Sequence, residues 1–435
     1  MSAPDVVVIG GGPAGLMASV AAGRAGARVL LLEKGPRLAR KLIVSGGGRC
    51  NVTNRKPVSE LIQHIPGNGR FLIRALQEFG SEEIIAFFEG LGVRLKEEDS
   101  GRVFPVSDRA VTVAEALIRH VRELGVTIRL RAPVARLTFA GGRCTGCVLA
   151  SGEAIPARAV VVAVGGCAAP DTGSTGDGYA WAREAGHTIT PLYPAEVPLV
   201  ADEPWVRDRT LQGLALRDVA LTLWDPRGKR ITTQRGDLLF THFGLSGPAA
   251  LRTSHYVSVT RLKLGNVPLT LTIDLLPDWS PDRAGREFQQ LAAAEPRRLV
   301  KNALRPLLPD RMIPLLLARA GVPPEVTGAH LSRAQGEALV RAVKAFPVTV
   351  TGTLSLREAF VTGGGVSVKE IDPRTMASRL VRGLFFAGEV MDVHGHTGGY
   401  NITIAFSTGY VAGRSAAALA LAERGQGGDS PSSGY

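Results

Sequence analysis

The chain has 435 residues, of which 45% are hydrophobic, so it is long enough for more than one domain with a sizeable core. Its longest apolar runs have the length of a strand, and its N-terminus enters a strand without a basic leader, so we expect neither a membrane span nor a signal peptide. The 51 lysines and arginines against 39 acidic residues, a net charge of +12, suggest an anionic partner, while four cysteines make no disulfide framework and favour a reducing cytoplasm.

The first 35 residues have the pattern of a dinucleotide-binding β-α-β unit. A buried-strand run, Val6–Ile9, leads directly into Gly10-x-Gly12-x-x-Gly15, and a helical stretch and a second apolar strand ending at Glu33 follow. Gly10 permits the tight turn, Gly12 lets the backbone approach a pyrophosphate, Gly15 lets helix pack on strand, and the helix N-terminus offers N–H groups to the phosphates. Glu33 stands where a carboxylate accepts the ribose hydroxyls. The complete unit predicts a bound dinucleotide.

The residues up to the middle of the chain alternate between helix and strand patterns. In chain order we expect a Gly/Arg-rich connection over 36–66, helices over 69–91 and 111–124, strands over 126–164 and a short helix over 179–185. Gly141-Gly142 and Ser151-Gly152 mark two hairpins. Cys144 and Cys147 have the spacing of a redox pair, but they fall within a strand, where alternation should place them on opposite faces, so we expect no redox role.

The second half of the chain predicts an insertion. Strand-like runs such as VALTLWD and LTLTIDL, over 191–276, are typical of a small antiparallel barrel or sandwich, and we assign a β-barrel there. A helical subdomain over 277–345 follows, in which Arg297, Arg298, Lys301 and Arg305 are spaced to share one helix face, either a solvated face or a contact for an anionic partner. Strand and glycine-loop signals return at 346, and the chain closes with a helix over about 402–423 and a polar tail, 426–435, that we expect to be disordered. The nucleotide-binding domain therefore comprises 1–190 and 346–425.

Residues 384–402, LFFAGEVMDVHGHTGGYNI, form a second half of the cofactor site. A strand runs to Gly388-Glu389, and after a loop a helix opens at Gly398–Asn401. An acid at a strand end suits a sugar or ribityl hydroxyl. A helix N-terminus opposite a ring carbonyl stabilises negative charge, which reduced flavin carries and nicotinamide does not. This segment favours a flavin.

Together these segments resemble the YhiN/BaiN-type flavoproteins, a family grouped with ribosomal RNA dihydrouridine synthase and aminoacetone oxidase. The matching stretches, in chain order, are GGGPAG, LEKGPRLARKLIVSGGGRCNVTN, LKEEDSGRVFPVSD, TGSTGDGYAWAREAGH, FTHFGLSGPA and VTGGGVSVKEIDPRTMASRLVRGLFFAGEVMDVHGHTGGYN. The resemblance implies FAD and an α/β fold, a Rossmann-like FAD/NAD(P)-binding domain of the glutathione reductase type interrupted by a barrel-plus-helices insertion. One departure from many relatives, His394-Gly395-His396, leaves the substrate open.

The resemblance also implies the residues that hold FAD. By position these are Gly10, Gly12, Pro13, Ala14, Gly15, Glu33, Lys34, Arg40, Lys41, Ser45, Gly46, Gly47, Gly48, Arg49, Asn51, Val134, Gly165, Asp177, Gly388, Glu389, Gly399, Asn401 and Ile402. No second GxGxxG opens a helix, so NAD(P)H, a possible electron donor, would dock transiently. We expect no metal and no membrane partner, and the pattern carries no signal for an oligomeric state.

Four side chains are candidates for the chemistry beside the flavin. Cys50 is the first, as a proton donor or only as a small packing residue. His394, His396 and Tyr400 stand next to the expected flavin edge, as proton donors or polar packing. Arg49 would hold an anionic substrate or a phosphate, and His242, on the insertion, is a weaker candidate.

Three functions follow. The first is an FAD-dependent oxidoreductase in which NAD(P)H-derived hydride reduces a conjugated C=C bond, either uridine in ribosomal RNA to dihydrouridine or a small enone. The basic charge favours RNA, whereas an aromatic content of 6% offers few stacking platforms. The second is a small-amine oxidase of the aminoacetone oxidase type. The third is a non-catalytic, FAD-containing RNA-binding protein.

Overall fold

The computed structural model describes residues 3–426, and the chain divides into two compact units. The first unit comprises Met1–Tyr193 with Phe360–Tyr435, and the second comprises Pro194–Ala359. The expected disordered tail lies, from residue 427 on, outside the described residues. Between residues 3 and 426, no helix is both long enough and apolar enough to cross a membrane.

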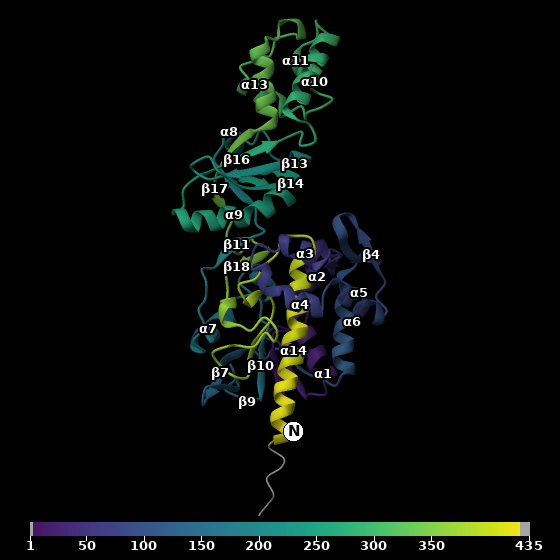
Figure 1. The fold of residues 1–435 in the computed structure, drawn as a ribbon, viewed down its shortest axis with the longest axis vertical. Helices are drawn as coiled ribbons and strands as arrows, with labels where there is room; N and C mark the ends of the chain where they lie inside the picture. The colour runs from purple at the N-terminus through teal and green to yellow at the C-terminus, as the bar shows by residue number, and fades with distance from the viewer. Residues whose placement is uncertain (1–2, 427–435) are drawn as a thin grey trace, which may run out of the picture. The chain divides into compact units, whose positions relative to one another are not determined.

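The first unit is built on a parallel five-stranded sheet, as the β-α-β pattern predicted (Figure 1). Its strand order is β19-β10-β1-β2-β6, so the N-terminal strand pairs with β10 and β2, and the strand near the C-terminus lies at one edge. The bounds are β1 Val6–Ile9, β2 Val29–Leu32, β6 Thr127–Arg129, β10 Ala159–Val162 and β19 Leu384–Phe386. The central strands are buried along their whole length, because helices cover the sheet.

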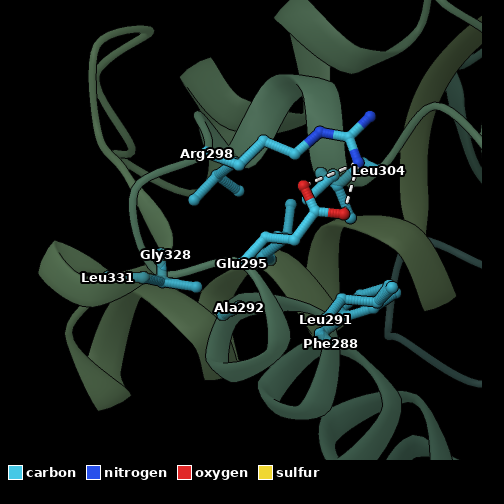
Figure 2. Close-up of a pocket in the computed structure, with 11 residues that line it drawn as sticks. Phe288, Leu291, Ala292, Glu295, Arg298, Leu304, Gly328 and Leu331 are labelled. Atoms are coloured by element: carbon cyan, nitrogen blue, oxygen red, sulfur yellow. Dashed lines mark hydrogen bonds and ion pairs between the residues drawn. The ribbon is translucent and has the colours of Figure 1, made fainter.

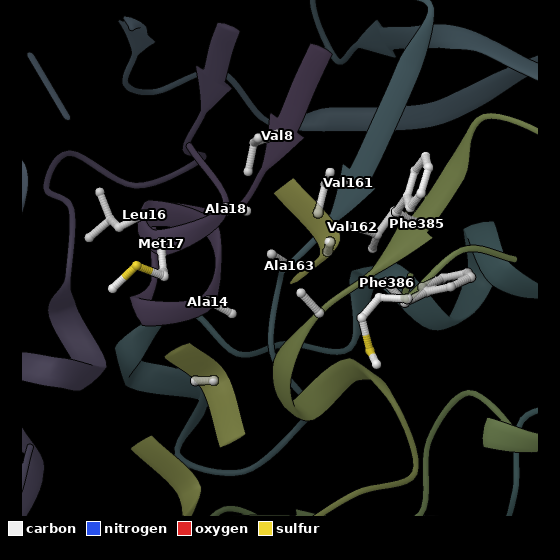
Figure 3. Close-up of a cluster of buried hydrophobic side chains, with 14 of the residues drawn as sticks. Val8, Ala14, Leu16, Met17, Ala18, Val161, Val162, Ala163, Phe385 and Phe386 are labelled. Carbon is white, nitrogen blue, oxygen red and sulfur yellow. The ribbon is translucent and has the colours of Figure 1, made fainter. Parts of the chain in front are cut away.

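Helices α1 (Pro13–Arg24) and α14 (Tyr400–Gln426) pack closely against each other. Small residues make this possible: a Cβ built on Gly409 would lie 2.3 Å from the Ala14 carbonyl oxygen, and one on Gly413 would lie 2.0 Å from that of Ala18. Figure 3 shows Ala14 and Ala18 on α1 beside the strand residues of the core. The two helices therefore join the ends of the chain in one core.

The remaining elements of the first unit surround the sheet. The helices are α2 Arg40–Val44, α3 Val58–Leu61, α4 Ile73–Glu78, α5 Ser81–Gly90, α6 Ala110–Glu123 and α7 Asp177–Glu184; the strands are β3 Thr53–Asn54, β4 Leu95–Glu98, β5 Arg102–Pro105, β7 Val134–Ala140, β8 Arg143–Leu149, β9 Ala154–Pro156 and β18 Val361–Gly363. Strands β7, β8 and β9 form an antiparallel sheet whose two turns contain Gly141-Gly142 and Ser151-Gly152, so both predicted hairpins are confirmed.

One prediction about this sheet is wrong. Cys144 and Cys147 are both completely buried in the core, although simple alternation would place them on opposite faces. The reason is a bulge in β8: the register shifts so that Phe139 pairs with Cys144 and the preceding Thr138 pairs with Gly146. Both thiols are free, and burial raises the pKa of Cys144 to about 11, so the pair behaves as core packing.

The second unit contains the predicted barrel and helices. The barrel is closed in the order β12-β15-β14-β13-β16-β17, and the core of this unit combines aliphatic side chains with aromatic ones such as Phe240 and Phe346. Its strands are β12 Leu199–Ala201, β13 Ala215–Trp224, β14 Arg230–Phe240, β15 Gly244–Ser246, β16 Leu269–Asp274 and β17 Phe346–Thr353; β11 Tyr193–Ala195 lies at the division between the units. The helices are α8 Pro204–Arg207, α9 Pro248–Leu264, α10 Pro281–Ala294, α11 Val300–Ala303, α12 Ile313–Arg319 and α13 Arg333–Lys344.

Two expectations about the insertion need correction. The Rossmann-like domain does not resume at residue 346, because β17 pairs with β16 and β12 and closes the barrel, and the second unit runs to Ala359. The basic residues near 300 do not share one helix face either. Helix α11 covers only Val300–Ala303, since Pro296 and Pro306 confine it. Arg298 instead pairs with Glu295.

Candidate functional site

The glycine-rich turn after β1 leaves open backbone at the start of α1. Gly10 has a φ of +107°, and a Cβ there would lie 2.4 Å from the Ala163 carbonyl oxygen, so only glycine fits. A Cβ on Gly15 would lie 1.8 Å from the Gly10 oxygen, which explains the close packing of helix on strand. A Cβ on Gly12 would meet no atom within 4 Å. The N-terminus of α1, with Pro13 in its first turn, is thus accessible to an anion.

Glu33 follows β2 and faces this turn. Its two carboxylate oxygens accept hydrogen bonds from the backbone N–H of Gly11 at 2.7 Å and of Gly35 at 2.6 Å. The Ala132 N–H donates to the Glu33 carbonyl oxygen at 3.0 Å, which brings the start of β7 at Val134 near the same edge of the sheet. The two fixed hydrogen bonds orient the carboxylate beside the glycine turn.

One lysine–acid pair and one arginine–carbonyl hydrogen bond connect the loops that follow β2 and β10. Lys34 Nζ lies 2.6 Å from Asp177 Oδ2, and Asp177 also accepts from the Thr175 hydroxyl at 2.7 Å. Arg40 donates to the Asp171 carbonyl oxygen. Gly165, at the end of β10, has a φ of +75°, which lets the chain leave the sheet towards this loop.

Glu389 lies after β19 and is held from two sides. Lys41 Nζ is 3.0 Å from Glu389 Oε2, and the Thr362 N–H donates to Oε1 at 2.7 Å. The Thr362 hydroxyl in turn accepts from the N–H groups of Cys167 at 2.8 Å and Ala168 at 2.9 Å. The sequence predicted Lys41 and Glu389 but missed Thr362, whose only signal was its place before the triple glycine of VTGGGV.

The loop from Ser45 to Asn51 has the left-handed backbone that its glycines predicted. Gly46, Gly47 and Gly48 have φ values of +58°, +68° and +84°, and a Cβ on Gly47 or Gly48 would meet no atom within 4 Å. The Ser45 hydroxyl donates to the Leu42 carbonyl oxygen at 2.7 Å, which ties the loop to α2. Gly47 and Gly48 therefore leave open backbone in this loop.

Arg49 is fully engaged within the protein. Its guanidinium pairs with Glu98 and Asp108, which also pair with Lys96, and it stacks over the Phe104 ring at 4.2 Å. Hydrogen bonds to the two carboxylates raise the pKa of Arg49, and those from Lys96 and Arg49 lower the pKa of Asp108. The acids lie in the stretch LKEEDSGRVFPVSD, which carried the family resemblance but no predicted role. The network fixes the glycine loop rather than offering a free cation.

The four candidate proton donors are deeply enclosed. Cys50 exposes 0% of its surface, His394 1%, His396 3% and Tyr400 5%. Burial raises the pKa of the Cys50 thiol to about 12, so it stays protonated at neutral pH. A side chain that contacts a ligand must be reachable in the ligand-free protein, so contact through Cys50 requires the loop around it to move.

The loop before α14 is pinned by Asn401. The Asn401 amide accepts from the Gly395 N–H at 2.8 Å and donates to the Gly395 carbonyl oxygen at 2.8 Å. The His394 backbone pairs with Gly67, the His396 N–H donates to the His64 carbonyl oxygen, and the His64 and Tyr400 rings stack at 4.8 Å. This loop and the helix end are therefore rigid.

The Asn51 side chain points towards the start of α14. Its Oδ1 atom is buried and has no hydrogen-bond partner among the described residues. A Cβ built on Gly399, whose φ is +96°, would lie 2.8 Å from this oxygen. Ile402, in the first turn of α14, is partly exposed beside Asn401. A buried acceptor without a donor at a helix N-terminus is suited to a ligand N–H.

Two further polar side chains, Tyr193 and Asp392, were missed. Both are partly exposed, and their segments lie on either side of the stretch that follows β18. Burial raises the pKa of the Asp392 carboxyl and that of the Tyr193 phenol. Perturbed pKa values next to one another are typical of functional sites.

The second unit contributes less polar chemistry. A narrow hollow between α10, α11 and α13 is lined mainly by aliphatic side chains and by Phe288, and at its edge Arg298 pairs with Glu295 at 2.8 Å (Figure 2). His242 is exposed between β14 and β15. Among residues 3–426, no three His, Cys, Asp or Glu side chains gather as metal ligands would.

Comparison with known proteins gives matches over nearly the whole chain. The family model described as HI0933-like protein Rossmann domain matches residues 4–415. The chain is 32% identical over 415 residues to the 3-dehydro-bile acid delta(4,6)-reductase of Clostridium scindens, across 94% of this chain and 98% of that protein. It is 34% identical over 409 residues to the ribosomal RNA dihydrouridine synthase of Escherichia coli, across 93% and 96%. The resemblance predicted from the motifs is confirmed.

Solved structures of lower identity share the fold. The 3-ketosteroid delta1-dehydrogenase of Sterolibacterium denitrificans has a TM-score of 0.52 at 14% identity, across 96% of this chain and 100% of that one. The 3-ketosteroid-delta4-(5alpha)-dehydrogenase of Rhodococcus jostii has a TM-score of 0.50 at 19% identity, across 95% and 96%.

Proposed function

Because the chain belongs to the HI0933-like family, we propose that it reduces a carbon–carbon double bond conjugated to a carbonyl group, and that uridine in ribosomal RNA is its substrate. The chain is an FAD-dependent oxidoreductase. The observation that carries the proposal is its full-length similarity to two relatives named for a delta(4,6)-reductase and a dihydrouridine synthase. Both names describe saturation of a C=C bond next to a carbonyl.

The residues of the first unit fit FAD. The open N-terminus of α1 at Gly12 suits the pyrophosphate, and the oriented Glu33 carboxylate suits the ribose hydroxyls. Glu389, held by Lys41, suits the ribityl chain. The orphaned Asn51 oxygen and the N-terminus of α14 suit the polar edge of the flavin ring.

FAD held by these residues would, after reduction by NAD(P)H, supply the hydride that the electron-poor carbon of the substrate accepts. The chain supplies the rest of the chemistry. The N-terminal dipole of α14 would stabilise negative charge on a flavin ring held there, and the loop pinned by Asn401 would help to exclude water. Cys50, His394, His396 and Tyr400 remain the predicted proton donors; Tyr400 and the two histidines reach the surface with a small part of their area.

The charge of the chain favours RNA over a small neutral enone. A net charge of +12 far exceeds what the two phosphates of FAD require. Exposed Arg286, Arg297 and Arg341 of the second unit have no carboxylate within ion-pair distance among residues 3–426, and such cations suit phosphate contacts. An RNA substrate implies that the protein acts in the cytoplasm.

Mass spectrometry of ribosomal RNA from cells lacking this protein tests the proposal. We expect one dihydrouridine to be lost, and to return with the wild-type protein but not with Glu389→Ala. Unchanged dihydrouridine would exclude RNA; NADPH-dependent reduction of a 3-oxo-4-ene steroid would then assign a small enone. Peroxide formation with aminoacetone would instead indicate the amine oxidase. Tight RNA binding with a flavin that NAD(P)H does not reduce would indicate a non-catalytic protein.

A further inference from the structure

The barrel of the second unit has a polar outer face on the adjacent strands β14, β13 and β16 (Figure 1). Leu221 and Leu223 of β13 are completely buried in the core of this unit, so the alternating residues Thr222 and Trp224 point outward. Residues paired across neighbouring strands share a face, and the partners of these two are Thr233 and Arg230 on β14 and Thr272 and Thr270 on β16. All six side chains are exposed or partly exposed, so this face is open to solvent.

Trp224 is the aromatic side chain of this face. Its indole N–H donates to the Thr272 hydroxyl at 2.9 Å. Thr272 lies two positions along β16 from Thr270, the residue paired with Trp224, so this hydrogen bond draws the ring across the sheet. Within residues 3–426, neither another ring nor a cation stacks on the indole, which is partly exposed. A ring that is fixed at its polar edge and otherwise free can stack on a planar ligand.

Three cations belong to the turn that connects β13 to β14. Arg227, Lys229 and Arg230 are exposed, and Arg230 is paired with Trp224 across the two strands. The carboxylate of Asp225 accepts the backbone N–H groups of Arg227 at 2.9 Å and of Lys229 at 2.8 Å, which fixes the turn. None of the three cations forms an ion pair with a residue between 3 and 426. The turn therefore presents three cations against one carboxylate, directly beside the tryptophan.

Towards the other end of the same strands the charges are paired. Arg235 lies 2.6 Å from Asp218 and 2.7 Å from Asp278. Lys344 lies 2.7 Å from Asp274, the last residue of β16. The unbalanced positive charge of this face is therefore concentrated at the end where Trp224 lies.

We propose that this face binds a single-stranded segment of RNA. One base stacks on the Trp224 ring, and the cations of the turn contact the phosphates on either side of that base. An aromatic platform beside cations is the combination that unpaired nucleic acid requires. Bases within a duplex already stack on their neighbours and do not reach such a platform, and the threonine hydroxyls of the face can bond to ribose 2′-hydroxyls. This inference rests on the proposed function, which supplies RNA as the substrate.

Fluorescence anisotropy of a labelled oligouridine of about twelve nucleotides tests the surface on the full-length, FAD-loaded protein. We expect Trp224→Leu to weaken binding about tenfold, because the stacking platform is lost, and Trp224→Phe to bind nearly as wild type does. Arg227→Gln, Lys229→Gln and Arg230→Gln, made together, should also weaken binding. They should lower the slope of log Kd against log salt by about two, since each phosphate contact to a single strand contributes about 0.7.

Matched controls separate the surface from general charge. Trp279→Leu removes a tryptophan whose ring is already covered by the Arg283 guanidinium at 4.9 Å. A triple variant of Arg207, Arg217 and Arg333 to glutamine removes three exposed arginines that are each paired with a carboxylate. Both controls should bind the oligouridine as wild type does.

Four results would overturn the inference. They are no binding by wild type, equal losses in the controls, a duplex RNA bound as tightly as the single strand, and displacement of the RNA by an equal concentration of polyglutamate, which would indicate an acidic protein segment instead. Should Trp224→Leu fail to fold, the variant of the three turn cations, whose side chains are exposed, still tests the salt slope.

The ribosomal RNA measurement separates this inference from the proposed function. Unchanged dihydrouridine in cells lacking the protein would contradict the proposed function. Lost dihydrouridine, together with wild-type affinity for oligouridine in Trp224→Leu and in the variant of the three turn cations, would contradict only this surface.

Discussion

Lys41 and Glu389 meet with their side chains 3.0 Å apart, although 348 positions separate them in the chain. Lys41 belongs to α2, near the N-terminal glycine turn, and Glu389 follows the last strand of the sheet. The polar groups suited to FAD thus come from both ends of the chain. The second unit, Pro194–Ala359, is inserted between them in the sequence. The cofactor site exists only when both ends fold together.

Replacing Glu33 should weaken FAD binding. The carboxylate is oriented by the N–H groups of Gly11 and Gly35, so Glu33→Ala removes a fixed acceptor for the ribose. A hydrogen bond to a charged group contributes about 1.5–3 kcal/mol, so we expect the Kd for FAD to rise by about ten- to a hundredfold. Flavin fluorescence titration measures it. Glu123→Ala, at an exposed site on α6, serves as the control, and an unchanged Kd in Glu33→Ala would remove Glu33 from the site.

Gly413→Ala should destabilise the first unit. A Cβ at this position would lie 2.0 Å from the Ala18 carbonyl oxygen, which belongs to rigid helix backbone, so α1 and α14 must separate. Overpacking of this kind costs about 1–3 kcal/mol. Gly425→Ala is a matched control on the same helix, because its Cβ would meet no atom within 4 Å. Thermal unfolding should show a lower Tm for Gly413→Ala alone; equal Tm values would contradict the packing described.

Asp5 should make the stability of the protein depend on pH in the acid range. Its side chain is fully buried and pairs with Arg28, Arg158 and Arg424. The Arg28 hydrogen bonds hold the pKa of Asp5 at about 2, below its value in the unfolded chain. Since the folded pKa is the lower one, this stabilisation, about 2 kcal/mol, is complete above about pH 4 and is lost as the pH falls towards 2.

Asp5→Asn checks this directly. The substitution removes the buried charge that pairs with three partly exposed arginines, so the variant should be less stable than wild type at pH 7. The difference in the free energy of unfolding should shrink as the pH falls below 4. A difference that stays constant from pH 7 to pH 3 would show that the Asp5 charge does not contribute.

The thiols should differ in reactivity. Burial raises the pKa of Cys50 to about 12 and leaves it without exposed surface, whereas Cys167 is partly exposed. Because the thiolate is the reactive form, we expect a thiol-specific disulfide reagent at pH 8 to modify Cys167 first. The fast phase should vanish in Cys167→Ser and persist in Cys50→Ser. The opposite pattern would show that Cys50 is reachable and would strengthen its predicted catalytic role.

Much of the fold, but only part of the candidate site, could be predicted from the sequence. The glycine spacing, Glu33 and the apolar strands predict the β-α-β unit, because each residue there has a local physical reason. Alternation failed at Cys144 and Cys147, since a bulge is not visible as a pattern. The predicted end of the inserted region was wrong at β17, because this strand follows the helices in sequence but pairs with the distant strand β12. Tyr193 and Asp392 were missed because only the folded chain places residues 189–193 and 390–392 on either side of the segment around Val366.

The most direct test of the central claim is the visible spectrum of the purified protein under anaerobic titration with NADPH. We expect the protein to carry a single FAD per chain, or to take it up on reconstitution, and we expect NADPH to bleach its flavin absorption. Glu389→Ala should lose much of the bound FAD. A well-folded wild-type protein that remains colourless after incubation with FAD would contradict this claim.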